Sequence, residues 1–270
     1  MGNNTTGSLQ SSPVSIDLTN VTGTKWTQLS RGVQHTCGLR DDGTGYCWGD
    51  NTYGQVGDNS TTQRLVPVPI DTTGVTGTKW TALSGGSTHS CGIRNNGTAW
   101  CWGDNGHGEL GNNSTTQSLV PVAVQSTGLN GLIWTNIYAN SGYSCGIRDN
   151  GAGYCWGYNA NGRLGTGEDT TAQYTVPIRV STDGVSGSKW TGFVDGAPQG
   201  TNCGIRNDGT MWCWGYTRYG TVGSLGVGYS GTPVSQWCGE PSGAPGQIIF
   251  NATSNKVELC TGVGWVDLGK

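Results

Sequence analysis

Residues 35–49 read HTCGLRDDGTGYCWG, and this stretch recurs three more times with few changes. The later copies begin at His89, Tyr143 and Thr201. Each copy holds two cysteines separated by nine residues, with a turn rich in Asp and Asn and ending in glycine between them. Glycine at the third place of such a turn suits the left-handed conformation of a three-residue hairpin loop. We therefore predict four β-hairpins of one design.

The register of these hairpins predicts disulfides. Counting outward from the turn pairs Arg40 with Thr44 and finally Cys37 with Cys47. Cysteines that face each other directly across two antiparallel strands lie within reach of a disulfide, whereas a zinc site would need closer ligand spacing. The two remaining cysteines make a fifth, wider pair, and five disulfides indicate an oxidising location. The predicted pairs are Cys37–Cys47, Cys91–Cys101, Cys145–Cys155, Cys203–Cys213 and Cys238–Cys260.

Each hairpin belongs to a longer repeat. A tryptophan followed by threonine precedes each hairpin, at spacings of 54, 54 and 56 residues. Apolar segments containing Val-Pro, such as residues 119–124, separate successive units. The Val-Pro segment, the Trp-Thr segment and the two hairpin arms give four strands per unit, which is typical of β-propeller blades. In this grouping, residues 13–18 start the first blade.

The predicted fold class is therefore all-β: a β-propeller of tandem four-stranded blades, with four clear repeats plus a divergent fifth. Residues 2–235 hold the propeller repeats, and residues 236–270 form a divergent C-terminal β blade or a small module. The tail, from Thr232 onward, offers a last set of four strand-like segments. Five blades are the preferred count, and four blades with a separate C-terminal module are the alternative, since both numbers fit known propellers.

The repeat resembles that of a known family. The unit Gly-x-x-His-Thr/Ser-Cys-Gly, then Asp-Gly-Thr, then Tyr-Cys-Trp-Gly-Asp-Asn-x-x-Gly-Gln-x-Gly, seen in residues 32–57, is similar to the repeat of the regulator of chromosome condensation family. The resemblance covers about residues 2–235 and implies a β-propeller. Cysteine-paired versions are similar to secreted bacterial proteins and to head fibres of phages that attach to flagella. The founder's nucleotide-exchange and chromatin activities are not expected here, because the chain is acidic and has no segment resembling the founder's catalytic wedge.

Composition excludes several function classes. The chain has 270 residues, 49 of them glycine, a net charge of −3 and only 11% charged residues. Its Lys and Arg residues are scattered, without the basic stripe that contact with a phosphate backbone requires, so nucleic acid is not an expected partner. No stretch approaches the roughly 18 apolar residues of a membrane helix, so membrane insertion is not expected. Residues 1–6 lack the pattern of a signal peptide.

Few titratable groups are available for catalysis. His35 and His89 occupy one repeat position, which Tyr143 and Thr201 fill in the other units, so we interpret both histidines as packing residues. The turn at residues 41–43 superficially resembles a calcium loop, but the equivalent turns carry too few carboxylates for the 6–8 oxygen ligands of calcium. The sequence predicts no enzymatic activity, no catalytic residue, no metal site and no cofactor.

Variation among the units locates the predicted contact surface. Scaffold positions must repeat, whereas contact residues need not. The loop after each Cys-Trp-Gly carries different side chains at equivalent places, and aromatic and Arg groups on such a loop are good interface anchors. The candidate binding residues are Tyr53, His107, Asn161, Arg218 and Tyr219.

These observations favour a non-enzymatic structural or binding protein on the surface of a phage virion. It would be a fibre or decoration subunit, possibly one that attaches to the host. The expected partners are a protein or glycan on a host cell surface, or neighbouring virion subunits, and the expected location is the virion surface or the extracellular space. The alternative is a secreted bacterial adhesin or protein-binding propeller.

Overall fold

The computed structural model describes residues 2–4, 11–168, 170–182, 184–185, 187–194, 200–216, 229–235, 247–251, 256–260 and 265–267, the last four segments by their backbone. Contacts divide the chain into two compact units. The first unit comprises Met1–Asn159 and Ala172–Arg179, and the second comprises Ala160–Thr171 and Val180–Lys270.

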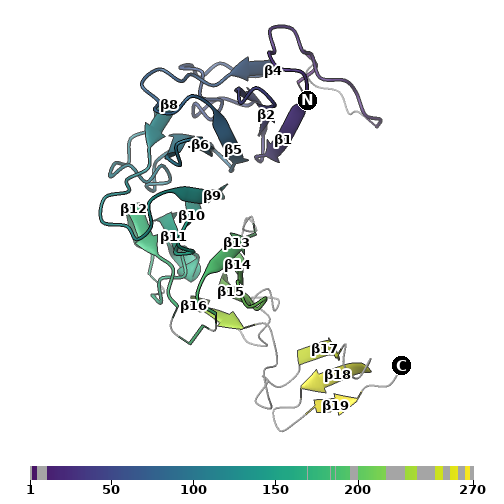
Figure 1. Cartoon of the computed structure of the whole chain (residues 1–270), viewed down its shortest axis with the longest axis vertical. Coiled ribbons are helices and arrows are strands. Elements are labelled where there is room, and N and C mark those ends of the chain that lie inside the picture. Colours follow the sequence, from purple (N-terminus) through teal and green to yellow (C-terminus); the bar gives the residue numbers. More distant parts are fainter. Residues whose placement is uncertain are drawn as a thin grey trace. The chain divides into compact units, whose positions relative to one another are not determined.

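Four antiparallel sheets of four strands each form the tandem blades, which are labelled by strand in Figure 1. Blade 1 comprises β1 (Trp26–Arg31), β2 (His35–Arg40), β3 (Gly45–Gly49) and β4 (Arg64–Pro69). Blade 2 comprises β5 (Trp80–Gly85), β6 (His89–Arg94), β7 (Ala99–Gly103) and β8 (Ser118–Ala123). Blade 3 comprises β9 (Trp134–Ala139), β10 (Tyr143–Arg148), β11 (Gly153–Tyr158) and β12 (Gln173–Arg179).

Blade 4 and a smaller C-terminal sheet lie in the second unit. Blade 4 comprises β13 (Trp190–Phe193), β14 (Thr201–Arg206), β15 (Met211–Tyr216) and β16 (Tyr229–Ser235). The C-terminal sheet comprises β17 (Gln247–Asn251), β18 (Lys256–Cys260) and β19 (Trp265–Asp267). A short 3-10 turn, η1 (Ala160–Gly162), precedes β12.

The Val-Pro strand is the last strand of each blade, and our grouping of it with the following hairpin was wrong. In blade 1, β4 pairs with β3 of the preceding hairpin, with Val68 opposite Cys47. Residues 13–18 form no strand. The tail segment from Thr232 likewise belongs to β16, so the C-terminal sheet has three strands rather than the expected four. The physical reason is that the β3–β4 loop folds back on itself and returns the chain along β3, whereas the next connection crosses to another blade.

The four hairpin disulfides are confirmed. Cys37 faces Cys47 in the β2–β3 ladder, and the three later pairs face each other in the same register. The paired Cα atoms lie 4.0–4.1 Å apart. Gly43 has a φ of +86°, as the three-residue turn requires. Cys238 and the side chain of Cys260 lie outside the described residues, so the fifth pair stays a prediction.

The apolar core of the first unit lies between blades rather than inside one sheet. β5 packs against β1 and β2, and β9 packs against β5 and β6. We call the face of a blade that contacts the next blade its trailing face, and the face that contacts the preceding blade its leading face. The core between blades 1 and 2 combines Leu39 and the Cys37–Cys47 disulfide from one trailing face with Trp80, Leu83 and Trp102 on the other side.

The repeated Cys-Gly-Ile-Arg motif supports the leading-face tryptophan. A Cβ on Gly92 would lie 2.7 Å from the Trp80 ring, so glycine is needed for the ring to lie flat on β6. The Arg94 guanidinium stacks 4.6 Å from the centre of the same ring and donates a hydrogen bond to the Gly77 carbonyl (2.7 Å). Stacking of this kind lets an arginine be buried without a carboxylate partner. The motif therefore repeats because each blade builds this face in the same way.

Removing one disulfide tests its contribution to stability. Replacing Cys91 and Cys101 together by alanine should lower the free energy of unfolding by about 2–3 kcal/mol through loop entropy alone, plus a smaller packing loss. The same double substitution at Cys203 and Cys213 closes a loop of equal length, but Cys203 is only half-buried. Urea unfolding without reductant should therefore give a smaller loss for the second variant. An equal or reversed order would show that packing of the disulfide against the next blade contributes nothing.

Candidate binding loops

The loops that follow each hairpin lie at one end of the blades. In blade 1, residues 50–63 connect β3 to β4, and in blade 2, residues 104–117 connect β7 to β8. Because β3 runs away from the hairpin turn at residues 41–43, its loop emerges at the opposite end of the sheet from that turn. The candidate residues Tyr53 and His107 lie in these two loops.

A buried asparagine holds each loop in shape. In blade 1, the Asn51 amide donates to the carbonyls of Ser60 (3.0 Å) and Thr62 (3.1 Å), and its oxygen accepts from the Val56 N–H (2.9 Å). Asn51 and Val56 are fully buried. Asn105 makes the equivalent three bonds in blade 2. Buried amides with all of these partners fix a loop that has no regular secondary structure.

The same loops are attached to the next blade. The Gln55 carbonyl accepts hydrogen bonds from Ser90 Oγ (2.8 Å) and from Trp102 Nε1 (3.0 Å) of blade 2. The Glu109 carbonyl accepts in the same way from Ser144 and Trp156 of blade 3. In the second unit, the carbonyl of Arg163 accepts from Asn202 and Trp214 of blade 4. Each loop therefore rests on a rigid support that repeats from blade to blade.

The two repeat-position histidines complete this attachment. His35 Nε2 lies 2.8 Å from Ser90 Oγ, and His89 Nε2 lies 2.8 Å from Ser144 Oγ. Burial lowers the pKa of His35 to about 4 and that of His89 to about 3, so both rings are neutral at physiological pH. The predicted packing role of these histidines is confirmed.

Tyr53 is an exposed aromatic residue on the blade 1 loop. It is 41% exposed, and its backbone N–H donates to Gln55 Oε1 (2.8 Å). A Cβ on the neighbouring Gly54 would lie 2.5 Å from the Leu119 side chain, which shows how closely the loop approaches β8. The tyrosine ring is thus presented to solvent by a backbone that is held on both sides.

His107 is part of a small polar and aromatic cluster on the blade 2 loop. Its ring stacks on Tyr158 with centroids 4.7 Å apart, and its Nδ1 accepts a hydrogen bond from the Gln173 amide (2.9 Å). Its backbone N–H donates to a Glu109 carboxylate oxygen (2.8 Å), and burial raises the pKa of Glu109. Sequence reasoning missed Tyr158 and Gln173. The available signal was that Tyr158 stands where the earlier copies have aspartate.

The other candidate residues are not brought to this cluster by the described structure. Asn161 lies in η1 in the second unit, with a φ of +64°, and is half-buried. Arg218 and Tyr219 lie outside the described residues. The structure therefore places two of the five candidates, Tyr53 and His107, on equivalent loops of one compact unit.

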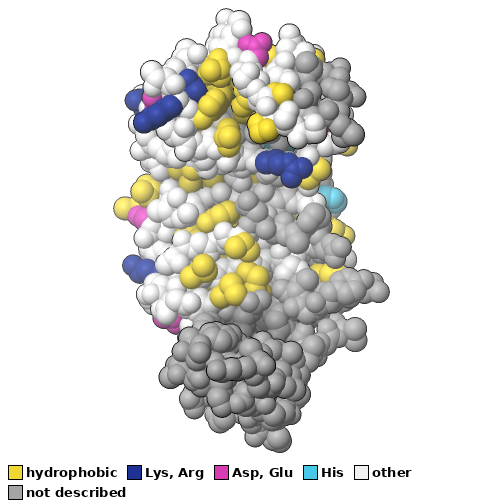
Figure 2. All heavy atoms as spheres, turned by 90° about the vertical axis from the view of Figure 1, so that its right-hand side faces the viewer, with side chains coloured by type: hydrophobic (Ala, Val, Ile, Leu, Met, Phe, Trp, Pro, Cys, Tyr) yellow, Lys and Arg dark blue, Asp and Glu magenta, His cyan; other side chains and the backbone are white. Residues whose placement is uncertain are grey.

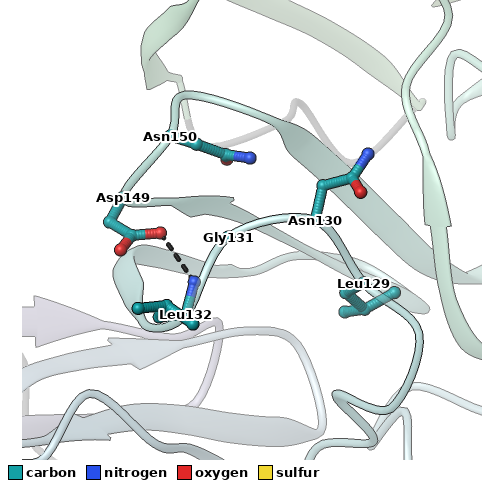
Figure 3. Close-up of a pocket in the computed structure, with 6 residues that line it drawn as sticks. All are labelled: Leu129, Asn130, Gly131, Leu132, Asp149 and Asn150. Atoms are coloured by element: carbon teal, nitrogen blue, oxygen red, sulfur yellow. Dashed lines mark hydrogen bonds between the residues drawn. The ribbon is translucent and has the colours of Figure 1, made fainter.

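A separate open pocket of about 510 Å³ lies at the hairpin-turn end of blade 3 (Figure 3). It lies between the loop at residues 129–132 and the turn residues Asp149 and Asn150. Asp149 accepts a hydrogen bond from the Leu132 N–H (2.9 Å), and the Leu132 side chain is 87% exposed. The carboxylate thus holds the loop in place, in the manner of a turn cap.

Surface chemistry points to contact rather than to catalysis. Within the described ranges, no group of three or more His, Cys, Asp and Glu side chains is arranged to hold a metal ion. On the described part of the face in Figure 2, Lys and Arg side chains lie in small separate groups. No helix in the described part of the chain is both long and apolar enough to cross a membrane.

Comparison with protein families agrees with this repeat structure. The family model described as the regulator of chromosome condensation (RCC1) repeat matches residues 42–93, 96–146 and 150–195, more than half of the chain. The chain belongs to the RCC1 repeat family. A second RCC1 repeat model matches residues 26–55 and 80–109. The resemblance inferred from the sequence motif is thereby confirmed.

The curated relatives of this RCC1 repeat chain are longer proteins. The ultraviolet-B receptor UVR8 of Arabidopsis thaliana is 26% identical over 218 residues, covering 80% of this chain and 47% of the receptor. Human E3 ubiquitin-protein ligase HERC2 is 26% identical over 190 residues, covering 69% of this chain and 4% of the ligase. The chain therefore spans less than half the length of either relative.

Solved structures confirm the propeller fold of the RCC1 repeats. Human WBSCR16 matches with a TM-score of 0.70 at 18% identity, covering 85% of this chain and 56% of that one. Prp20p from Saccharomyces cerevisiae, which was described with its binding properties to Gsp1p and histones, matches with a TM-score of 0.67 at 16% identity. That match covers 93% of this chain and 58% of Prp20p. At these identities the likeness concerns the fold alone.

Proposed function

We propose that the chain is a non-enzymatic, protein-binding propeller exposed on a phage virion, as a fibre or decoration subunit, and that its blade loops contact the partner. The observation that carries this proposal is the contrast within the loops. The supports at Asn51 and Asn105 repeat with the same hydrogen bonds, whereas the exposed positions carry Tyr53 in one blade and His107 in the next. A rigid scaffold that presents different side chains is the usual construction of a binding surface.

Two further observations support the location outside the cell and a protein partner. Four hairpin disulfides persist most readily in an oxidising environment. The solved relative Prp20p was described by its binding to the proteins Gsp1p and histones, and a propeller of the same repeat family offers a comparable kind of surface. For the present chain, the proposed partner is a protein of the host cell surface.

Substitution of the loop residues tests the contact surface. Tyr53→Ala and His107→Ala should each weaken binding of the fluorescently labelled chain to intact host cells by about tenfold, as expected when an anchor residue is truncated. Leu132→Ala is the matched control, because Leu132 is exposed at the hairpin-turn end of blade 3. Flow cytometry across a concentration series gives the apparent affinities. Equal affinities for all four proteins would place the contact surface elsewhere.

The location needs an independent test. Antibodies against the chain, used with gold labels in electron microscopy, should mark virions purified from the native source. Labelling of the bacterial surface or of secreted material, with unlabelled virions, would instead support the secreted bacterial adhesin. The two experiments are separable, because loop substitutions measure the contact surface wherever the protein resides.

A further inference from the structure

The leading face of blade 1 is uncovered. Leu29 of β1 is 58% exposed, whereas the equivalent residues Leu83 and Ile137 in blades 2 and 3 are 2% and 6% exposed. Trp26 is only half-buried, while its counterpart Trp80 is 3% exposed. The residue types on this face match those of the two buried leading faces, so blade 1 presents a surface of core composition to solvent.

One corner of this leading face already shows how it is covered. A Cβ on Gly2 would lie 2.8 Å from Trp48 Nε1, and a Cβ on Gly57 of the blade 1 loop would lie 2.6 Å from Trp102 Nε1. Residues near the start of the chain thus occupy the place on blade 1 that a preceding loop occupies on blade 2. The face is built to receive a blade, and Trp26 and Leu29 are the part that remains open.

The trailing face of blade 4 is uncovered in the same way. Ile205 is 45% exposed, whereas Leu39 and Ile93 at the same position in blades 1 and 2 are 7% and 3% exposed. Val194 is 49% exposed and stands where blade 2 has the buried Ser84. This end is therefore more apolar than the inner trailing faces, and an exposed apolar surface of this kind marks an interaction site.

The polar groups that hold an inner junction are missing from the blade 4 face. Between blades 1 and 2, the Gln28 amide bonds both backbone groups of Leu83, and Ser30 Oγ accepts from the Gly85 N–H. In blade 4 these two positions are Gly192 and Val194. A junction made by this face would rest on apolar packing, which is suited to association between separate chains.

We propose that the chain associates head to tail with a second copy of itself, so that the leading face of blade 1 in one copy packs on the trailing face of blade 4 in the other. The inner junctions supply the precedent, since Leu39 of one trailing face and Leu83 of the next leading face lie in one core cluster. Leu29 and Ile205 occupy these same two positions and are both open. A contact between two different faces is heterologous, so two such contacts can close a ring of two chains. This inference goes beyond the proposed function.

Sedimentation velocity of the 270-residue chain at micromolar concentrations tests the association. The wild type should sediment as a dimer, and Leu29→Arg and Ile205→Arg should each sediment as a monomer, because a buried unpaired guanidinium is costly. Both residues are exposed in the single chain, so circular dichroism and thermal unfolding should stay unchanged. Leu132→Arg, on an exposed residue outside both faces, should remain a dimer.

Mixing the two variants identifies the faces that meet. Leu29→Arg keeps an intact trailing face and Ile205→Arg keeps an intact leading face, so an equimolar mixture should recover a dimer held by one junction. That dimer should dissociate at a higher concentration than the wild type, which has two junctions. A monomeric wild type overturns the proposal. So does a mixture that stays monomeric, or a dimer that survives one of the two single substitutions, because that would indicate a face that pairs with itself.

Discussion

Replacing Trp102 by alanine should lower the free energy of unfolding by about 3–5 kcal/mol, which is the range for large aromatic residues removed from a core. The Trp102 ring is fully buried and belongs to the cluster that contains Leu39 and the Cys37–Cys47 disulfide. Its Nε1 also donates to the Gln55 carbonyl (3.0 Å). The substitution therefore leaves a cavity between two blades and removes one of the bonds that hold the blade 1 loop.

Trp102→Phe separates these two contributions. Phenylalanine keeps much of the ring volume but loses the Nε1 donor, so the loss should fall to roughly 1–3 kcal/mol. Urea unfolding with intact disulfides, followed by tryptophan fluorescence and circular dichroism, measures both variants. If Trp102→Ala were no worse than Trp102→Phe, the cluster between blades would not be the main source of stability.

Lowering the pH from 7 to 5 should destabilise the protein through His35 and His89. Burial lowers the pKa of His35 to about 4 and of His89 to about 3, whereas in the unfolded chain both titrate near 6.5. Below pH 6.5 the unfolded chain therefore binds protons that the folded chain does not, and stability falls as the pH falls. Each histidine should cost roughly 1.4 kcal/mol per pH unit in this range, until the folded rings also protonate.

The double variant His35→Gln, His89→Gln should lose most of this slope between pH 6.5 and 5. Carboxylates contribute mainly at lower pH, so this window isolates the histidines. His107→Gln is the control, because His107 is half-exposed in a surface loop. Urea unfolding at a series of pH values measures the slopes. Equal slopes for the double variant and the wild type would mean that the buried rings accept protons without opening the junctions.

Local pattern was sufficient for the hairpins. The turn at residues 41–43 and the nine-residue spacing of Cys37 and Cys47 fix a register within about 15 residues of chain, and short-range geometry leaves little choice. The packing role of His35 and His89 followed from their repetition. The exposed loop positions Tyr53 and His107 were also found from the sequence, because variation between repeats is visible there.

Only the tertiary structure decided which sheet each Val-Pro strand joins. The apolar pattern of β4 is the same whichever neighbour it pairs with, and its pairing with β3 depends on the loop that Asn51 holds. The partners of His107, Tyr158 and Gln173, lie on the next blade and far along the sequence, so no local signal linked them.

Exposure is the clearest case of this division. Leu29 and Leu83 occupy one repeat position, and the sequence alone treats them alike. In the structure Leu83 is buried because blade 1 covers it, while Leu29 is open because no described blade lies on its face. The sequence determined the blade and its disulfide. Burial depends on which blade comes to lie beside it, and only the assembled array sets that.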